Sequence, residues 1–324
     1  MLLNRQLGLL KEKLPTNNRL LVIYTGKDSF GDANLELCGR ALLRNKAVQI
    51  DLLTLPKLLP QFKEDDVFLG VYAGIDQLDP DNYDAVLMAE FNHRSLRLKA
   101  KYFGKLPFAC LFGYFDGPAR NQATFSYAAF NDIFSLGLDD STLLSTAKPY
   151  LNCLRDTERS VEEVIPAQPF LALSIGGVDP YRSYAHWAAV LHQFDQQNTP
   201  TTICHVVLIG SDNGIEMAQA MQREKFVNLK LSSQVGALSL LQTRALISRA
   251  TLFLGCDGGL MHVAHSTQTP TVALFSVKEP FAYWTTSACH CHAIQSLGGA
   301  SDISPSEIVK GVHTHLSRIS NCLI

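Results

Sequence analysis

The chain has 324 residues, of which 47% are hydrophobic and 18% are charged, and its formal net charge is −2. This length predicts two domains rather than one, and the composition is typical of a globular protein rather than a disordered or membrane-spanning one. The charge argues against a nucleic-acid-binding protein, because such proteins usually carry a marked basic excess.

Targeting signals and cysteine usage bear on the location of the protein. No apolar run approaches the roughly 20 residues that cross a bilayer, and the N-terminus has no recognisable secretion signal. The eight cysteines are mostly scattered singly, which fits a reducing compartment better than a disulfide framework. The sequence therefore predicts a cytoplasmic protein.

In chain order, short apolar runs alternate with segments of helix length. The N-terminal half predicts strands at 20–24, 48–53, 85–89 and 108–112 and a helix near 33–44. The C-terminal half predicts strands at 170–174, 205–209, 251–254 and 269–275, with helices at 183–196, 214–221 and 238–248. This alternation is typical of parallel sheets with right-handed crossovers, so we expect an α/β fold with two doubly wound, Rossmann-like domains. The charged, proline-containing segment 155–169 predicts a boundary between domains 1–160 and 161–324.

The segment that follows the predicted strand 251–254 contains the most informative residues. A helix-length stretch opens there on Asp257, Gly258 and Gly259. Glycines allow a ligand to approach the backbone, and a helix N-terminus offers unpaired N–H groups to an anion. With Asp257 and His262 as flanking polar groups, this pattern predicts a pocket for a phosphorylated ligand. The alternatives are a tight turn without a ligand and, for His262, a buried helix histidine bonded to backbone.

Three segments resemble the heptosyltransferase family, inverting GT-B glycosyltransferases that build the lipopolysaccharide inner core from ADP-heptose. Residues 255–262 with the following run 270–275 are similar to the family's Asp-x-Gly-x-x-His signature and its next strand. Residues 21–23, with the loop that ends at Asp32, resemble the first strand and loop. Residues 171–177, which lead to the helix with Trp187, resemble the opening of the donor domain. The resemblance implies two Rossmann-like domains facing each other across a cleft, with the acceptor bound by 1–160 and the donor by 161–324.

The resemblance also implies roles for individual positions. Asp32 matches the catalytic base, and Asp257 matches the carboxylate associated with the heptose of the donor. The backbone N–H groups of Gly258 and Gly259 match those that hold the pyrophosphate, and His262 matches the histidine of the same phosphate site.

Further positions concern the edges of this site and the departures from the family pattern. Leu238 and Ser239 fall in the turn that borders the adenine in relatives. Where relatives carry a lysine before the tryptophan helix, the loop offers Arg182 as its only cation. The loop 23–31 is about two residues longer than usual, and Cys38 replaces a proline. These differences leave the expected fold unchanged and bear on the acceptor and the sugar.

The chemistry of sugar transfer assigns the same residues independent roles. A hydroxyl is a poor nucleophile, so a carboxylate such as Asp32 must accept its proton; the alternatives are that Asp32 only caps a helix or that Glu36 is the base. The leaving diphosphate gains charge, which the N–H groups at Gly258 and Gly259 can stabilise without a metal. Arg182 would add a bidentate cation, unless it is an ordinary surface arginine. No cofactor is expected.

The sequence argues against a zinc site and against two other classes of nucleotide-binding enzyme. Cys289, His290, Cys291 and His292 are adjacent, so they cannot surround one zinc ion tetrahedrally, and no second ligand pair follows at zinc-finger spacing. The chain has neither a G-x-G-x-x-G nor a Walker A sequence, so dinucleotide oxidoreduction and phosphate-loop hydrolysis lack their usual pattern.

Two basic or amphipathic segments bear on the acceptor. Between residues 92 and 105 the charged residues are all basic: Arg94, Arg97, Lys99, Lys101 and Lys105. They form either a solvated helix face or a surface for a phosphorylated glycolipid or an anionic membrane leaflet. In residues 1–14 four leucines share one helical face. This face would either pack against the N-terminal domain or dock on a membrane.

The sequence thus predicts an inverting glycosyltransferase that transfers a heptose from ADP-heptose, or a similar nucleotide sugar, to a lipopolysaccharide inner-core acceptor. Its partners would be the nucleotide sugar and a phosphorylated glycolipid at the inner membrane, and no nucleic acid. The alternatives are a GT-B transferase with another donor or acceptor, and a non-catalytic protein that binds sugar nucleotides.

Overall fold

The computed structural model describes residues 19–90, 92–112, 121–197 and 203–322. The chain divides into two compact units, Met1–Asn152 and Cys153–Ile324, so the structure places the division before the predicted position after residue 160. The predicted helical face in residues 1–14 lies outside the described residues. Among the helices that the structure describes, none combines the length and the hydropathy that a membrane span requires.

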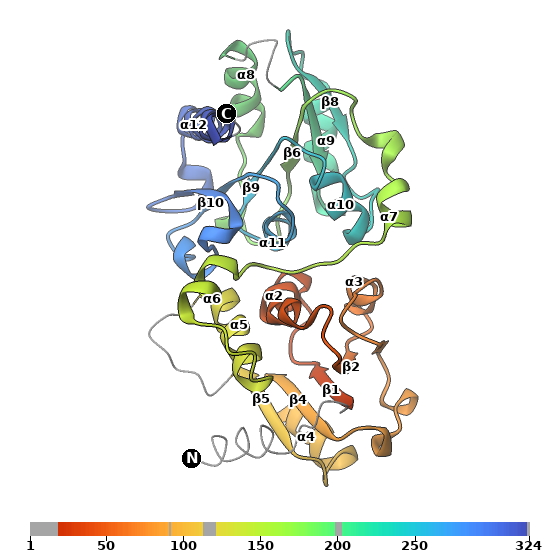
Figure 1. Cartoon of the computed structure of the whole chain (residues 1–324). Coiled ribbons are helices and arrows are strands. Elements are labelled where there is room, and N and C mark those ends of the chain that lie inside the picture. The colour runs from red at the N-terminus through yellow and green to blue at the C-terminus, as the bar shows by residue number, and fades with distance from the viewer. Residues whose placement is uncertain (1–18, 91, 113–120, 198–202, 323–324) are drawn as a thin grey trace. The chain divides into compact units, whose positions relative to one another are not determined.

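The N-terminal unit contains a five-stranded parallel sheet with the strand order β3-β2-β1-β4-β5 (Figure 1). The strands are β1 (Arg19–Tyr24), β2 (Gln49–Thr54), β3 (Gly70–Tyr72), β4 (Ala85–Glu90) and β5 (Phe108–Phe112). The helices are α2 (Phe30–Glu36), α3 (Leu59–Phe62), α4 (His93–Tyr102), α5 (Gln122–Ile133) and α6 (Asp140–Thr146), and the 3-10 turns are η1 (Cys38–Leu43), η2 (Ile75–Gln77) and η3 (Pro80–Asn82).

Side chains that alternate along the strands supply separate hydrophobic cores on the two faces of this sheet. Leu20 and Val22 of β1 pack on one face with residues of α2 and α5. Leu21 and Ile23 pack on the other face with Leu96 and Leu98 of α4. Helix α4 therefore covers the face opposite to α2.

The predicted helix near 33–44 is wrong in one respect. The α-helical part ends at Glu36, and the chain continues as the 3-10 helix η1. The reason is the close approach of α5: the N–H of Gly39 donates to Ser126 Oγ at 2.8 Å, and a side chain at Gly39 would collide with the backbone of Ser126.

The C-terminal unit contains a six-stranded parallel sheet with the order β11-β10-β9-β6-β7-β8 (Figure 1). The strands are β6 (Phe170–Ser174), β7 (His205–Ile209), β8 (Lys230–Ser233), β9 (Leu252–Cys256), β10 (Thr271–Phe275) and β11 (Cys291–Gln295). The helices are α7 (Arg155–Arg159), α8 (Trp187–Gln197), α9 (Ile215–Gln222), α10 (Leu240–Ile247), α11 (Gly259–His265) and α12 (Pro305–Cys322). Short 3-10 turns are η4 (Glu162–Val164), η5 (Pro180–Arg182), η6 (Asp212–Gly214), η7 (Phe281–Tyr283), η8 (Ser287–Cys289) and η9 (Ala300–Asp302).

Both units are doubly wound, as the sequence predicts. In each sheet the strand order reverses beside the first strand, between β1 and β4 and between β6 and β9. Ligands of open α/β sheets bind at such switch points, beyond the carboxyl ends of the strands. The fold therefore directs attention to the loops after β1 and β4 and to those after β6 and β9.

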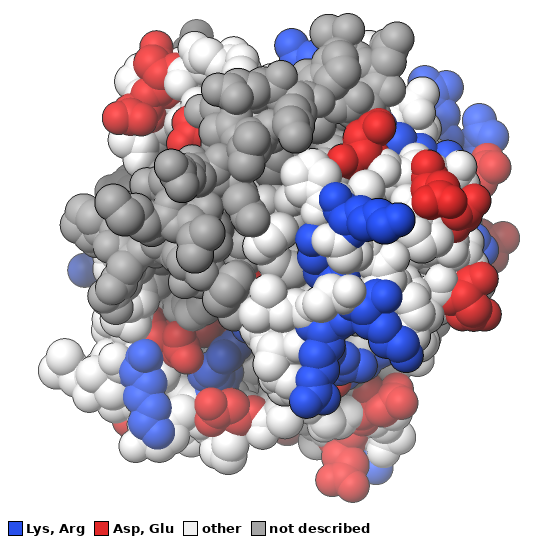
Figure 2. All heavy atoms as spheres, turned by 90° about the horizontal axis from the view of Figure 1, so that it is seen from below, with Lys and Arg blue, Asp and Glu red and all other residues white. Residues whose placement is uncertain are grey.

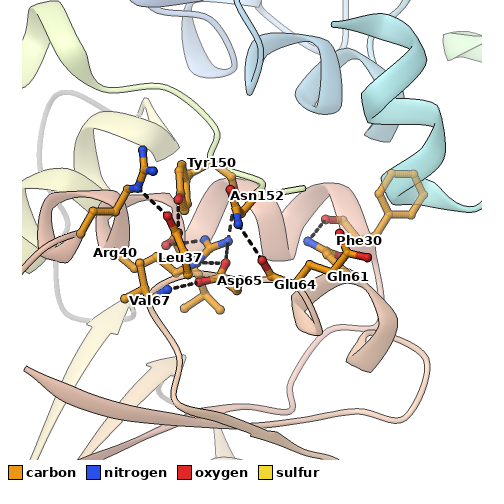
Figure 3. Close-up of polar contacts among 11 residues, drawn as sticks. Phe30, Leu37, Arg40, Gln61, Glu64, Asp65, Val67, Tyr150 and Asn152 are labelled. Atoms are coloured by element: carbon orange, nitrogen blue, oxygen red, sulfur yellow. Dashed lines mark hydrogen bonds and ion pairs between the residues drawn. The ribbon is translucent and has the colours of Figure 1, made fainter. Parts of the chain in front are cut away.

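A buried ion pair ties the end of the N-terminal unit to its core (Figure 3). The guanidinium of Arg40 bonds Asp65 Oδ2 at 2.7 Å and the carbonyl oxygen of Tyr150 at 2.9 Å. The side chains of Arg40 and Asp65 are 0% and 1% exposed, and the aromatic ring of Phe62 packs against the guanidinium. Asn152 adds a bond to the carbonyl oxygen of Glu64 at 2.7 Å. These contacts anchor the last residues of the unit.

Candidate active site

The C-terminal cluster is built on the carboxyl ends of β6, β9 and β10, which are neighbours in the sheet. β9 is followed by Asp257, β6 by the loop that ends in Arg182, and β10 by the loop that contains Glu279. The strands approach closely there, since a side chain at Gly255 would collide with Cβ of Ser174. Residues far apart in the sequence are therefore brought to one edge.

Arg182 and Asp257 form the centre of this cluster. Arg182 Nε lies 3.3 Å from Asp257 Oδ2, and its Nη1 lies 3.9 Å from Glu279 Oε1. The Asp257 side chain is 2% exposed, whereas that of Arg182 is 35% exposed. Carboxylates thus hold the guanidinium of Arg182 on one side, while part of it stays accessible to a ligand. An ordinary surface arginine is not held in this way.

Gly258 and Gly259 form the start of α11. Gly258 is its N-cap residue and gives the helix no side-chain cap, so the first N–H groups of the helix are available to another partner. A Cβ at Gly258 would lie 3.9 Å from Arg182 Nη2. The structure therefore places Arg182, Asp257 and Gly258 side by side.

His262 lies in the middle of α11 and is 5% exposed. Burial, and secondarily the positive charge of Arg182, lower the pKa of His262 to about 3. Its ring lies 6.0 Å from that of Trp284, and Trp284 Nε1 donates to Glu279 Oε2 at 2.9 Å. His262 is therefore neutral at physiological pH and can offer a ligand a hydrogen bond but no positive charge.

The buried neutral state of His262 gives a first testable prediction, on pH dependence. The unfolded chain binds a proton at this histidine below its ordinary pKa of about 6.5, whereas the folded chain does not do so until about pH 3. The free energy of unfolding contributed by this site is therefore complete above pH 6.5 and falls as the pH drops towards 3. Between pH 7 and pH 5 we expect wild type to lose about 2 kcal/mol more than His262→Gln.

Urea unfolding followed by tryptophan fluorescence measures this difference, because both tryptophans, Trp187 and Trp284, lie in the C-terminal unit. His186→Gln is the matched control, since this histidine is exposed. Equal pH slopes for wild type and His262→Gln would contradict the buried neutral histidine.

Leu238 and Ser239 lie at the start of α10, after the carboxyl end of β8. Ser239 is the N-cap residue: its hydroxyl accepts from the N–H of Gln242 at 3.2 Å, and its own N–H donates to Gln242 Oε1 at 3.0 Å. This capping box fixes the turn, but no contact of the described residues joins it to Arg182 or Asp257. The role of this turn beside an adenine stays a prediction.

In the N-terminal unit, Asp32 lies in the first turn of α2 at the switch point between β1 and β4. The N-cap residue of this helix is Ser29, whose hydroxyl accepts from the N–H of Asp32 at 3.4 Å. Asp32 is therefore not the cap, which removes the structural alternative for this residue. Within the described chain its carboxylate has no hydrogen-bond or ion-pair partner, so it is free to accept a proton from a substrate.

Glu36, the alternative base, has a different environment. Its carboxylate is 6% exposed, forms an ion pair with Lys27 and accepts from the hydroxyl of Tyr24 at 3.0 Å. Burial raises the pKa of the Glu36 carboxyl, and the Lys27 ammonium partly offsets this rise. Lys27 also lies 3.5 Å from Glu90 at the end of β4. Glu36 therefore holds the loop before α2 in place through Lys27. Because the Glu36 carboxylate is buried and already paired, Asp32 is the better candidate for the base.

Sequence reasoning missed several residues of these two clusters. Lys27 and Glu90 come together only because β1 and β4 are adjacent in the sheet. Glu279 and Trp284 reach Arg182 and His262 from the loop after β10, and Lys278 of that loop lies 3.5 Å from the ring centre of Tyr181. The one available signal was their position directly after a predicted strand.

Other candidates do not join either cluster. Cys38 is buried in η1. His290, in the Cys–His segment, has left-handed backbone, and its carbonyl oxygen lies 2.9 Å from His315 Nε2. Over the described ranges, no three His, Cys, Asp or Glu side chains lie close enough to hold a metal ion.

Comparison with known families relates this part of the chain to a family of enzymes. Residues 144–296 match the model of glycosyltransferase family 9 (heptosyltransferase). The resemblance to this family is thereby confirmed, and so is the expected enzyme class, a glycosyltransferase. The matching stretch contains every residue of the C-terminal cluster and does not reach Asp32. No curated protein matches the chain.

Solved structures show the same GT-B fold. A family 9 glycosyltransferase from Veillonella parvula DSM 2008 is 18% identical, with a TM-score of 0.74 over 93% of this chain and 97% of that one. The E. coli ADP-heptose lipopolysaccharide heptosyltransferase II is 16% identical, with a TM-score of 0.66 over 93% and 99%. E. coli heptosyltransferase WaaC with ADP is 12% identical, with a TM-score of 0.68 over 92% and 99%.

Proposed function

We propose that the protein is an inverting, metal-independent glycosyltransferase that transfers a heptose from ADP-heptose to an inner-core lipopolysaccharide acceptor. The observation that carries this proposal is the group of Arg182, Asp257 and Gly258 at the β6/β9 switch point, within the stretch that matches the family model. Solved structures with this fold include WaaC bound to ADP and to ADP-2-deoxy-2-fluoro heptose, which supports an ADP-sugar donor.

In the proposed mechanism Asp32 accepts the proton of the acceptor hydroxyl while its oxygen attacks the anomeric carbon of the heptose. The bond from that carbon to the diphosphate oxygen breaks on the opposite face, so the configuration inverts and ADP leaves. A carboxylate without an internal partner suits a base, because nothing competes for the incoming proton.

The leaving diphosphate gains negative charge, and the C-terminal cluster provides groups that stabilise it. Arg182 supplies the positive charge, and the N–H groups of Gly258 and Gly259 donate without reorganisation. His262 adds a neutral hydrogen bond. Asp257, with its carboxylate held by Arg182, orients the heptose hydroxyls, and the turn at Leu238 and Ser239 borders the adenine.

The acceptor would be a phosphorylated glycolipid, which places the protein in the cytoplasm at the face of the inner membrane. We propose that its contact with the membrane is peripheral; none of the described helices could span a membrane. A nucleic-acid partner is not proposed, given the net charge of −2.

The role of Asp257 gives a second prediction: its replacement should change the affinities for ADP and for ADP-heptose differently. Asp257→Asn removes a negative charge from beside an anionic donor, so ADP should bind as well as before or more tightly. The heptose hydroxyls lose a charged hydrogen-bond partner, so ADP-heptose binding should weaken about tenfold or more relative to ADP. Isothermal titration with both ligands measures the difference, and Arg182→Gln should weaken both ligands together.

The control for this prediction is Glu224→Gln, an exposed carboxylate beyond the end of α9. It should change neither dissociation constant. A parallel loss of ADP and ADP-heptose binding in Asp257→Asn would assign Asp257 to the support of Arg182 alone and exclude the sugar contact.

A transfer assay tests the proposal as a whole. Purified protein is incubated with ADP-heptose, heptose-free lipopolysaccharide and EDTA; mass spectrometry detects the product, and NMR gives the anomeric configuration. Transfer with inversion is expected. If transfer occurs only from another nucleotide sugar, the assignment of ADP-heptose as the donor is wrong. If the donor binds but is neither transferred nor slowly hydrolysed, the protein is a non-catalytic sugar-nucleotide-binding protein.

A further inference from the structure

Charged side chains that the proposed mechanism leaves without a role occur in both units. In Figure 2, seen from the side on which α4 lies, Lys and Arg side chains gather next to one another. Arg94, Arg97 and Lys101 of this helix are exposed, and their part in binding an acceptor stays a prediction. Glu279, in the loop after β10, is different, because its side chain is only 26% exposed and lies against Arg182 of the C-terminal cluster.

The backbone on both sides of Glu279 is fixed by one side chain. The amide nitrogen of Gln295, at the end of β11, donates to the carbonyl oxygen of Ser276, and its Oε1 accepts from the N–H of Phe281 at 3.2 Å. Between these two positions the N–H of Glu279 donates to the carbonyl oxygen of Ser276 at 3.1 Å, which closes a turn. The Glu279 carboxylate is therefore presented from a fixed backbone.

The two oxygens of this carboxylate have different partners. Oε2 accepts from Trp284 Nε1 at 2.9 Å, and the ring of Trp284 lies 6.0 Å from that of His262. Oε1 faces Arg182 Nη1 at 3.9 Å. This distance is longer than a hydrogen bond, so the negative charge orients the guanidinium without occupying its N–H donors. Glu279 therefore acts on the cation of the cluster directly and on its neutral histidine through Trp284.

The three nitrogens of the Arg182 guanidinium face three different residues. Nε lies 3.3 Å from Asp257 Oδ2, and Nη1 faces Glu279. Nη2 is the nitrogen next to Gly258, since a Cβ at this glycine would lie 3.9 Å from it. Because the guanidinium is planar and rigid, the two carboxylates at Nε and Nη1 also fix the direction of Nη2. Without Glu279 the group would be held at Nε alone and could turn Nη2 away from Gly258.

The charges of the cluster indicate that Glu279 does not serve the affinity for the donor. Arg182 contributes one positive charge, Asp257 and Glu279 contribute two negative charges, and His262 is neutral. The cluster therefore has one negative charge in excess, and a second carboxylate beside a diphosphate opposes binding. The contribution of Glu279 then lies in the orientation of Arg182, which matters most when charge develops on the leaving diphosphate oxygen.

We propose that Glu279 is a positioning residue for the transfer reaction, which fixes Arg182 with Nη2 towards the diphosphate oxygen that leaves with ADP. This inference rests on the proposed function, and it adds a residue that touches neither the donor nor the acceptor. Glu279→Gln separates the two contacts of the side chain. The amide oxygen of glutamine still accepts from the N–H of Trp284, but the variant has no charge to orient Arg182.

Transfer rates and calorimetric ADP binding of the full chain test the proposal in wild type, Glu279→Gln, Arg182→Gln and the double variant. In Glu279→Gln, kcat should fall about 10–100-fold. Its dissociation constant for ADP should stay within about threefold of wild type or decrease, because the loss of a negative charge offsets the poorer orientation of Arg182. In the Arg182→Gln background, Glu279→Gln should change kcat less than about twofold, since it acts through Arg182. Glu307→Gln, an exposed carboxylate of α12, is the matched control and should change neither quantity.

A role of Glu279 in holding Trp284 alone predicts different results. Tryptophan emission should change in Glu279→Ala, which removes the acceptor of the indole N–H, and stay as in wild type in Glu279→Gln. Trp187 is 1% exposed in the core and contributes a constant background. A normal kcat in Glu279→Gln, additive losses in the double variant, or a loss of ADP binding that parallels the loss of turnover would each overturn the positioning of Arg182.

The ³¹P NMR spectrum of bound ADP separates this proposal from the proposed function, because it requires no acceptor. If wild type binds ADP but transfers no heptose, the proposed function is wrong. In that case a shift of the β-phosphate resonance in Glu279→Gln, but not in Glu307→Gln, supports the positioning of Arg182, and an unchanged resonance overturns it. If wild type binds no ADP, both proposals are wrong.

Discussion

Replacing Asp32 with asparagine is expected to lower turnover about 10²–10⁴-fold, the usual contribution of a general base. The dissociation constant of ADP-heptose should stay within about twofold of wild type, because the proposed donor site lies in the other unit of the chain. The fold should tolerate the change, since Ser29 and not Asp32 caps α2. Initial rates of transfer and calorimetric donor binding, measured on the same preparation, separate the two effects.

Asp28→Asn is the matched control for this substitution. Asp28 is an exposed carboxylate of the same loop, 3.4 Å from Lys57, and its loss should leave turnover nearly unchanged. Retained turnover in Asp32→Asn together with an inactive but folded Glu36→Gln would move the base to Glu36. Glu36→Gln alone is expected to loosen the loop through Lys27, so its defect should include lower stability.

The second large effect concerns the stability of the N-terminal unit. Asp65→Asn leaves the buried guanidinium of Arg40 without its counter-charge, so the free energy of unfolding should fall by about 3–5 kcal/mol. The neighbouring pair offers the control: Arg44 and Asp66 are 50% and 32% exposed, and Asp66→Asn should cost less than about 1 kcal/mol.

Hydrogen exchange of the β1 and β4 amides in increasing urea measures this loss in the unit concerned. Tryptophan fluorescence reports on the C-terminal unit and serves as an internal reference, because both tryptophans lie there. Similar losses for Asp65→Asn and Asp66→Asn would contradict the buried pair. The double replacement Arg40→Met with Asp65→Leu should recover most of the loss, since it removes both charges.

The sequence predicted the central strands of both sheets because they are continuous apolar runs buried on both faces. It missed β3, β8 and β11, which are edge strands with little apolar pattern: β3 has three residues, β8 reads Lys-Leu-Ser-Ser, and β11 reads Cys-His-Ala-Ile-Gln. It also could not end α2 at Glu36, because that end depends on the contact of Gly39 with Ser126, far along the chain.

The candidate site was predictable to a similar extent. Asp257, Gly258 and His262 are close in sequence, so a local pattern reveals them. The pairing of Arg182 with Asp257 and Glu279 requires three strands to be adjacent, which a single sequence does not specify. The neutral state of His262 likewise follows from burial that no local pattern encodes.

The central claim is that the C-terminal unit binds ADP-heptose, and equilibrium binding in EDTA tests it most directly. The ligands are ADP-heptose, ADP, UDP, GDP and the corresponding UDP- and GDP-sugars. The account predicts that the adenine nucleotides bind preferentially and that the heptose strengthens binding, with Arg182→Gln weakening both ligands. Preference for uridine or guanosine nucleotides would contradict the ADP-heptose assignment, and binding of none of them would leave the cluster at Asp257 as a turn without a donor.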